Sequence, residues 1–217
     1  MNFKKIIPLL LCFSFIFSAQ AQKDPKAKAI LEAVSQKYQS LDGLKATFEY
    51  TYIHEKDGIH QSNTGEVAVK GDKYRLKLDD QEIFNNSKTS WTLIKTNSYQ
   101  EVTISDVDDQ MNELTPSNIY TLYKKGYNYR LLGEKTFEGR QVNEVELISE
   151  KPGEQIQRVK LMVEKNTNDL IGWEMHDNTG GLLKYKFKDV DSKVKLNDSY
   201  FAFDKSKYPG VEVIDLR

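Results

Sequence analysis

Alternation of apolar and polar side chains between residues 44 and 78 constrains the fold more than any other feature of the sequence. Successive side chains of a strand point to opposite faces of the sheet, so this pattern predicts strands with one apolar face and one solvated face. Such strands are typical of an antiparallel sheet. The apolar positions of the pattern are Phe48, Tyr50, Tyr52, Val67, Val69, Tyr74, Leu76 and Leu78.

Turn signals separate this stretch from many further strand-like segments. Asp57-Gly58 predicts a hairpin turn, and Lys70-Gly71-Asp72 predicts a second one. Alternating segments continue almost to the C-terminus, with turns every 8 to 12 residues, so we expect about ten strands in an antiparallel sandwich or barrel.

Two segments have helical spacing instead. Asp24 and Pro25 suit the N-cap and first position of a helix that continues to Gln39. Ile30 and Val34 lie on its apolar face. A shorter helix is predicted from Ser117 to Lys125, and its apolar face carries Ile119, Leu122 and Tyr123.

The first 21 residues predict a cleaved secretory signal peptide. Two lysines precede an apolar run too short to span a bilayer, and Ala19-Gln20-Ala21 matches the pattern that signal peptidase cuts. Cys12, the only cysteine, lies in this segment, and Leu11 before it is too large for a lipoprotein signal. We therefore expect a soluble exported protein with one domain over residues 22–217.

Charge and composition exclude several classes of function. The sequence has 31 Lys and Arg against 32 Asp and Glu, interspersed, which gives no electrostatic footprint for nucleic acid or anionic membrane. Without a cysteine after residue 21, the exported chain has no disulfide, thiol nucleophile or thiolate metal site.

Few residues carry recognisable chemistry. His54 and His60 flank the first hairpin turn and could face each other, with Glu55 or Asp57 as a third metal ligand, but surface polar residues are the better interpretation. The acidic residues Asp106, Asp108 and Asp109 lack the glycine and glutamate of a calcium loop. No catalytic motif or phosphate loop is present. We expect a protein that is not an enzyme and uses no cofactor.

The alternation alone does not determine what covers the apolar face of the sheet. The face could be a packed interior, since a small barrel can be filled by its own side chains, or it could line a binding cavity. The two tryptophans, Trp91 and Trp173, are core candidates on the same reasoning.

The order of several segments resembles the periplasmic outer-membrane lipoprotein carrier family, LolA, over residues 24–215. After the N-terminal helix these segments are L-D-G-L-K-A-T-F-E-Y-T, G-E-V-A-V-K-G-D-K-Y-R-L-K-L, S-K-T-S-W, T-P-S-N-I-Y-T-L-Y and F-A-F-D-K-S-K-Y-P-G-V-E-V-I-D. The resemblance implies an incomplete antiparallel barrel whose opening is covered by the two helices as a lid. It implies a cavity for acyl chains lined by Phe48, Tyr50, Tyr52, Val67, Val69, Tyr74, Leu76, Trp91 and Leu93, with lid residues Ile30, Val34, Ile119, Leu122 and Tyr123.

One position departs from the family pattern. Better-known members carry an arginine that latches the lid by hydrogen bonds, and Gly71 occupies the matching position here. The usual latch therefore cannot form, and Arg75 on the next strand is predicted to face water.

The resemblance implies a periplasmic chaperone that carries acylated lipoproteins from the inner to the outer membrane. Its partners would be an inner-membrane ABC-type releasing complex and an outer-membrane acceptor, and we expect a monomer. The alternative is an envelope sensor or interaction domain of the same fold that shuttles nothing, although we expect no second domain after Asp215. An exported hydrolase is disfavoured because no His, Ser and carboxylate set converges.

Overall fold

The computed structural model describes residues 23–107 and 115–217, and within these ranges it contains one twelve-stranded sheet. One α-helix and four short 3-10 helices accompany the sheet in the described ranges. The elements are α1 (Pro25–Gln39), β1 (Leu44–His54), η1 (Glu55–Asp57), β2 (Ile59–Lys70), β3 (Lys73–Lys77), β4 (Gln81–Asn85), β5 (Thr89–Lys95), β6 (Gln100–Asp106), η2 (Ile119–Lys124), β7 (Tyr127–Phe137), β8 (Arg140–Ser149), β9 (Ile156–Glu164), β10 (Leu170–Asp177), β11 (Leu182–Asp191), η3 (Asp198–Phe201), η4 (Lys205–Lys207) and β12 (Glu212–Asp215).

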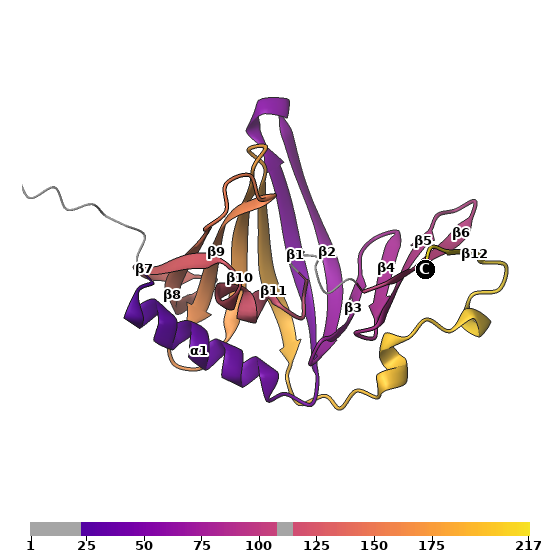
Figure 1. Ribbon diagram of the computed structural model, residues 1–217, viewed down its shortest axis with the longest axis horizontal. Coiled ribbons are helices and arrows are strands. Elements are labelled where there is room, and N and C mark those ends of the chain that lie inside the picture. The colour runs from indigo at the N-terminus through magenta and orange to yellow at the C-terminus, as the bar shows by residue number, and fades with distance from the viewer. Residues whose placement is uncertain (1–22, 108–114) are drawn as a thin grey trace, which may run out of the picture.

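The strands form one curved, open sheet in the order β12-β6-β5-β4-β3-β2-β1-β11-β10-β9-β8-β7 (Figure 1). Hairpins join most neighbours, but β1 pairs with β11 although the two strands are far apart in the sequence. β12 pairs with β6 in parallel. The curved, unclosed sheet agrees with the incomplete barrel that the resemblance implies. The prediction of about ten strands, all antiparallel, is wrong, because the described sheet has twelve strands and β12 pairs in parallel.

Two turns form where the sequence predicts them. Gly58 follows η1 at the tip of the β1–β2 hairpin with φ +65°, and Gly71 joins β2 to β3 with φ +56°. Side chains other than glycine rarely adopt such values, which explains both glycines.

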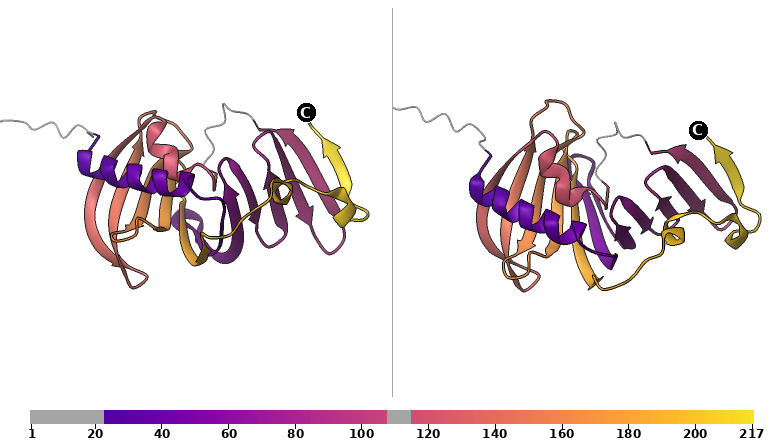
Figure 2. Two further views of the ribbon diagram at one scale, coloured as in Figure 1. Left: turned by 90° about the horizontal axis from the view of Figure 1, so that it is seen from below. Right: turned by 60° about the horizontal axis from the view of Figure 1, so that its bottom comes forward.

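α1 and η2 lie side by side across the concave face of the β7–β11 half of the sheet (Figure 2). Asp24 caps α1 by accepting a hydrogen bond from the Lys26 amide at 2.8 Å, and Pro25 begins the helix. The helix buries Ala27, Leu31 and Val34 against this face. Because β6 and β7 lie at or near opposite ends of the sheet, the chain that joins them must cross it, and η2 belongs to this crossing.

The segment after β11 covers the opposite, convex face of the other half, around β2 to β6 (Figure 1). Phe201 is fully buried in a cluster with Ala68 of β2. Further along, Val211 packs with Phe84 of β4 and Leu93 of β5. The sheet thus has apolar cores on opposite faces of its two halves.

Candidate functional site

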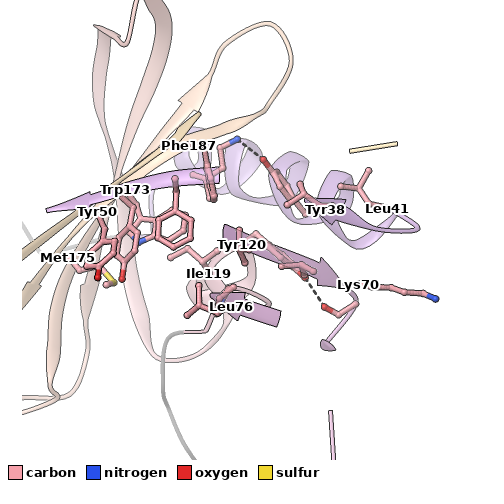
Figure 3. Close-up of a pocket in the computed structure, with 18 of the residues that line it drawn as sticks. Tyr38, Leu41, Tyr50, Lys70, Leu76, Ile119, Tyr120, Trp173, Met175 and Phe187 are labelled. Atoms are coloured by element: carbon pink, nitrogen blue, oxygen red, sulfur yellow. Dashed lines mark hydrogen bonds between the residues drawn. The ribbon is translucent and has the colours of Figure 1, made fainter. Parts of the chain in front are cut away.

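An apolar pocket of about 140 Å³ lies between the concave face of the sheet and the end of α1 together with η2 (Figure 3). Its walls come from β1, β2, β3, β10 and β11, from α1 and η2, and from loops beside them. The lining residues are Tyr38, Leu41, Leu44, Phe48, Tyr50, Val67, Val69, Lys70, Gly71, Leu76, Leu78, Pro116, Ile119, Tyr120, Leu170, Trp173, Met175, Tyr185 and Phe187.

Several side chains that the family resemblance implies for the cavity line this pocket. The predicted residues that line it are Phe48, Tyr50, Val67, Val69, Leu76 and, from η2, Ile119. The register explains their convergence, since Val67 pairs with Leu76 and both therefore point to the face that carries Phe48.

Two predicted residues share this face but lie outside the pocket lining. Tyr52 pairs with Leu183 nearer the hairpin tip, where its ring stacks on His54 with centroids 6.4 Å apart. Tyr74 pairs with Val69 and is buried beside the pocket without lining it.

Trp91 and Leu93 do not line the pocket, so the prediction that they belong to the cavity is wrong. Both belong to the convex-face cluster with Phe84 and Val102. The register shows the reason: Phe84 pairs with Trp91 and with Arg75, whose neighbour Leu76 points into the pocket. The apolar side chains of β4 and β5 therefore occupy the other face from those of β3.

The residues predicted for the lid gather in one buried cluster. Val34, Ile119, Leu122 and Tyr123 pack with the apolar face of β7 to β10, and the partly exposed Ile30 packs against the same cluster. The second helical segment is a 3-10 helix over Ile119–Lys124, shorter than the predicted Ser117–Lys125.

Seven of the nineteen lining residues are aromatic, and those of β10 and β11 are not among the residues predicted for the cavity. Trp173 of β10 lies 4.8 Å from the Tyr185 ring and 5.3 Å from the Phe187 ring, between ring centroids. Tyr185 in turn stacks on Tyr50, with centroids 6.0 Å apart. The alternation of β10 and β11 is visible in the sequence, but the β1–β11 pairing that brings these residues to Tyr50 and Phe48 has no local signal.

Tyr120 closes the pocket beside the β2–β3 turn. Its ring stacks on Tyr38 of α1, with centroids 5.6 Å apart and an interplanar angle of 19°. Its hydroxyl donates to the Gly71 carbonyl at 3.4 Å (Figure 3). Burial, with Asp72 nearby, raises the pKa of Tyr120 to about 12, so this phenol is neutral and can donate.

Arg75 lies on the convex face and cannot replace an arginine latch. Its guanidinium pairs with Glu82 at 2.7 Å and stacks over the rings of Phe84 and Tyr200, at 4.5 and 4.8 Å from their centroids. The prediction that it faces water is therefore wrong in part, because two rings and a carboxylate cover it.

Polar contacts tie both ends of α1 to the sheet. At the N-terminal end, the Asp24 carboxylate accepts from the Leu131 amide of β7 at 3.0 Å, and the Asp24 amide donates to the Tyr129 carbonyl at 3.0 Å. At the C-terminal end, the Lys37 ammonium binds Asp169 at 2.5 Å. The Tyr38 hydroxyl accepts from the Leu170 amide at 3.0 Å. By contrast, the polar contact between η2 and the β2–β3 turn is the long hydrogen bond, 3.4 Å, from the Tyr120 hydroxyl to the Gly71 carbonyl.

The hairpin histidines do not form a metal site. His54 is buried, and its ring nitrogens lie 2.8 Å from the Asp57 carboxylate and 3.2 Å from the Thr179 carbonyl oxygen. His60 pairs with Ile53, so it points to the other face of the hairpin and is exposed. The expectation of two surface histidines that could face each other is wrong for His54.

The described part of the chain contains neither a metal cluster nor a membrane-spanning helix. Over residues 23–107 and 115–217, no group of three His, Cys, Asp or Glu side chains could hold a metal ion. In the same ranges no helix has the length and hydropathy to cross a membrane. Asp108 and Asp109 of the acidic segment, and the predicted signal peptide, lie outside the described residues.

Comparison with known proteins connects this architecture to a family. The family model for the outer membrane lipoprotein carrier protein LolA matches residues 39–204. The sequence is 25% identical to the uncharacterized protein MJ0687 of Methanocaldococcus jannaschii over 94% of this chain, which spans 58% of the length of that relative.

Two solved structures resemble this one at low sequence identity, and the first of them supports a shared fold. An uncharacterized conserved protein of Thermus thermophilus superposes with a TM-score of 0.58 at 14% identity, covering 88% of this chain and 99% of the other. A LolA superfamily protein of Nitrosomonas europaea gives a TM-score of 0.45 at 13% identity, covering 82% of this chain and 98% of the other. Since the family model matches most of the sequence, the chain belongs to the LolA family of outer membrane lipoprotein carrier proteins.

Proposed function

We propose that this protein is a periplasmic chaperone that binds lipoprotein acyl chains in its pocket and carries lipoproteins from the inner to the outer membrane. Membership of the LolA family supports this function. The observation that carries the proposal is the pocket itself, which is walled by aliphatic and aromatic side chains from both halves of the sheet and closed by α1 and η2.

A carrier must replace the bilayer as an apolar solvent. Each buried methylene is worth about 0.8 kcal/mol, so an acyl chain of about 15 carbons requires about 12 kcal/mol of compensating apolar contact. The pocket side chains supply such contact. No phosphate-loop motif is present in the sequence, so an ATP-driven partner in the inner membrane would drive loading, and a tighter-binding acceptor would receive the lipoprotein.

The pocket must widen to accept its ligand. Its volume of about 140 Å³ resembles that of an engineered cavity of about 150 Å³ that holds benzene. A chain of about 15 carbons needs more space. One of the two covering elements therefore moves during loading.

We propose η2 as the gate, with α1 as a fixed wall. The polar contacts at both ends of α1 hold it to β7 and to the β9–β10 turn. Opening η2 requires that Tyr120 leave its stack on Tyr38 and release the Gly71 carbonyl, and that the apolar side chains of η2, with the Tyr123 ring on Tyr129, withdraw from the sheet.

Cross-linking tests the gate. Cys12, within the predicted signal peptide, is the only cysteine of the sequence, so cysteine pairs introduced after residue 21 have no competing thiol there. Asp72→Cys with Tyr120→Cys, bridged by a short bis-maleimide, should block acyl loading. The matched pair Lys37→Cys with Asp169→Cys, bridged in the same way, should leave loading intact. If the α1 bridge blocks loading and the η2 bridge does not, the gate assignment is wrong.

A release assay tests the function. Inner-membrane vesicles that contain the ABC-type releasing complex and a labelled lipoprotein receive ATP and this protein, and the soluble lipoprotein complex is measured. Leu76→Glu places a charge on a half-buried pocket position and should reduce release at least tenfold, because a carboxylate among acyl chains is costly.

The matched control is Leu132→Glu on β7, since Leu132 is 40% exposed and does not line the pocket. This control should release lipoprotein as the natural protein does. Binding of lipoprotein without any release from the vesicles would favour the sensor or interaction domain instead.

A further inference from the structure

The indole nitrogen of Trp173 is a buried donor without an acceptor. Trp173 lines the pocket and is 8% exposed, and its Nε1 atom is covered by protein and makes no hydrogen bond. An indole N–H can only donate, and leaving it unpaired in an apolar site is unfavourable. Buried tryptophans usually find a partner, so an orphaned N–H inside a ligand pocket points to an acceptor that the ligand brings.

Two tyrosines lie beside Trp173 at its end of the pocket. The Tyr185 ring stands 4.8 Å from the indole, and Tyr50 stacks on Tyr185. Figure 3 shows Trp173, Tyr50 and Met175 at one end of the pocket, away from Tyr38. Burial raises the pKa of Tyr185 to about 12, so its phenol carries no charge. This end of the pocket therefore offers neutral donors.

The charges of the lining residues restrict the kind of acceptor. Among the lining residues only Lys70 is a cation, and its ammonium already binds the Leu196 carbonyl at 2.8 Å and Asp198 at 3.2 Å. A carboxylate or phosphate brought to the indole would lose its hydration without gaining a counter-charge. A neutral carbonyl oxygen accepts the same hydrogen bond at a much lower desolvation cost.

We propose that Trp173 Nε1 donates to the carbonyl oxygen of the ester or amide that attaches an acyl chain, so that the linkage, and not only the hydrocarbon, enters the pocket. This inference rests on the proposed function and deepens it, because it makes the pocket selective for acyl lipids over alkyl lipids of the same length. The indole becomes accessible when the pocket widens for its ligand.

Paired ligands and paired tryptophan variants test the inference. The probes are methyl palmitate and hexadecyl methyl ether, which differ at the carbonyl, and affinities are measured by displacement of a fluorescent fatty-acid analogue. Trp173→Phe removes the N–H and keeps a ring. Trp91→Phe is the matched control, because Trp91 lies on the convex face.

The quantity compared is the affinity for the ester divided by the affinity for the ether. This ratio should be about tenfold higher in Trp91→Phe than in Trp173→Phe, because one hydrogen bond to a buried donor contributes about this factor. Equal ratios for the two variants would overturn the inference and leave the proposed function standing. If no variant and no natural protein binds either probe or any acylated lipoprotein, the proposed function fails together with the inference.

A second measurement covers the case in which Trp173→Phe does not fold. Trp173 is the only tryptophan left in the Trp91→Phe variant. Palmitoyl esters brominated beside the carbonyl should quench its fluorescence more strongly than esters brominated at the chain terminus. Stronger quenching by the terminal bromine would contradict the proposed orientation.

Discussion

Gly65 of β2 gives the sharpest test of the pocket geometry. It pairs with Phe48 of β1, and a Cβ atom built on Gly65 would lie 2.9 Å from both Cε atoms of Phe48 and closer still to Cζ. The Phe48 ring therefore lies flat over the glycine, and Gly65→Ala must push the ring toward Tyr50 and Tyr185, whose centroids are 6.0 and 5.7 Å from it.

Overpacking of this kind costs about 1–3 kcal/mol, whereas alanine in a strand is about 0.5–1 kcal/mol better than glycine. We expect Gly65→Ala to lower the free energy of unfolding by about 1–2 kcal/mol and to weaken acyl binding, since the displaced ring enters the pocket. Phe48→Leu lacks the Cε and Cζ atoms that meet the new methyl group, so in that background Gly65→Ala should be neutral or stabilising.

Equilibrium urea unfolding of the four proteins in this cycle measures the coupling. The expected coupling energy is about 2 kcal/mol, with acyl binding recovered in the double variant. If Gly65→Ala has the same effect in both backgrounds within about 0.5 kcal/mol, the close approach of Phe48 to Gly65 is refuted.

Three further predictions concern regions outside the pocket. Phe201→Ala should lower the free energy of unfolding, measured in urea, by about 3–5 kcal/mol, because Phe201 is fully buried on the convex face. The affinity for acyl chains should stay the same, and a lower affinity in the folded variant would contradict this prediction. Glu146→Gln should destabilise by about 1–3 kcal/mol, since the buried carboxylate pairs with Arg130 at 2.6 Å and Arg158 at 3.3 Å; an unchanged urea midpoint would count against it. The Leu131 and Lys26 amides lower the pKa of Asp24, so its contribution to stability is present above about pH 4 and is lost as the pH falls through the lowered pKa. Asp24→Asn should therefore show a weaker loss of stability below pH 4, and an acid profile identical to that of the natural protein would refute the role of the carboxylate.

Local patterns predict the strands well because each needs only its own sequence. The alternation around Phe48 and Val67 identifies β1 and β2, and Gly58 and Gly71 mark their turns. The same reasoning misses β12, because only Val213 and Ile214 are apolar in that short edge strand and its parallel partner β6 lies far away in the sequence. The local sequence determines whether a segment forms a strand, whereas the choice of its pairing partner depends on residues far away in the sequence.

The same distinction between local pattern and long-range pairing explains which site residues can be predicted from the sequence. Alternation shows that two residues share a face within one strand, but it does not say which face of the sheet that is. The predicted face is therefore correct for the strands from β1 to β3 and wrong for β5. Trp91 and Leu93 of β5 point to the convex face, which the C-terminal segment covers. The sequence does not predict that Trp173 and Tyr185 line the pocket, because the β1–β11 pairing joins segments more than a hundred residues apart.

Native mass spectrometry tests the central claim most directly. The protein is purified from a periplasmic extract of cells that make a tagged triacylated lipoprotein, and its mass is measured without denaturation. We expect a complex with one lipoprotein, reduced in Leu76→Glu and retained in Leu132→Glu. A mass of the protein alone, together with no lipoprotein uptake from an energised inner-membrane preparation, would contradict the carrier function.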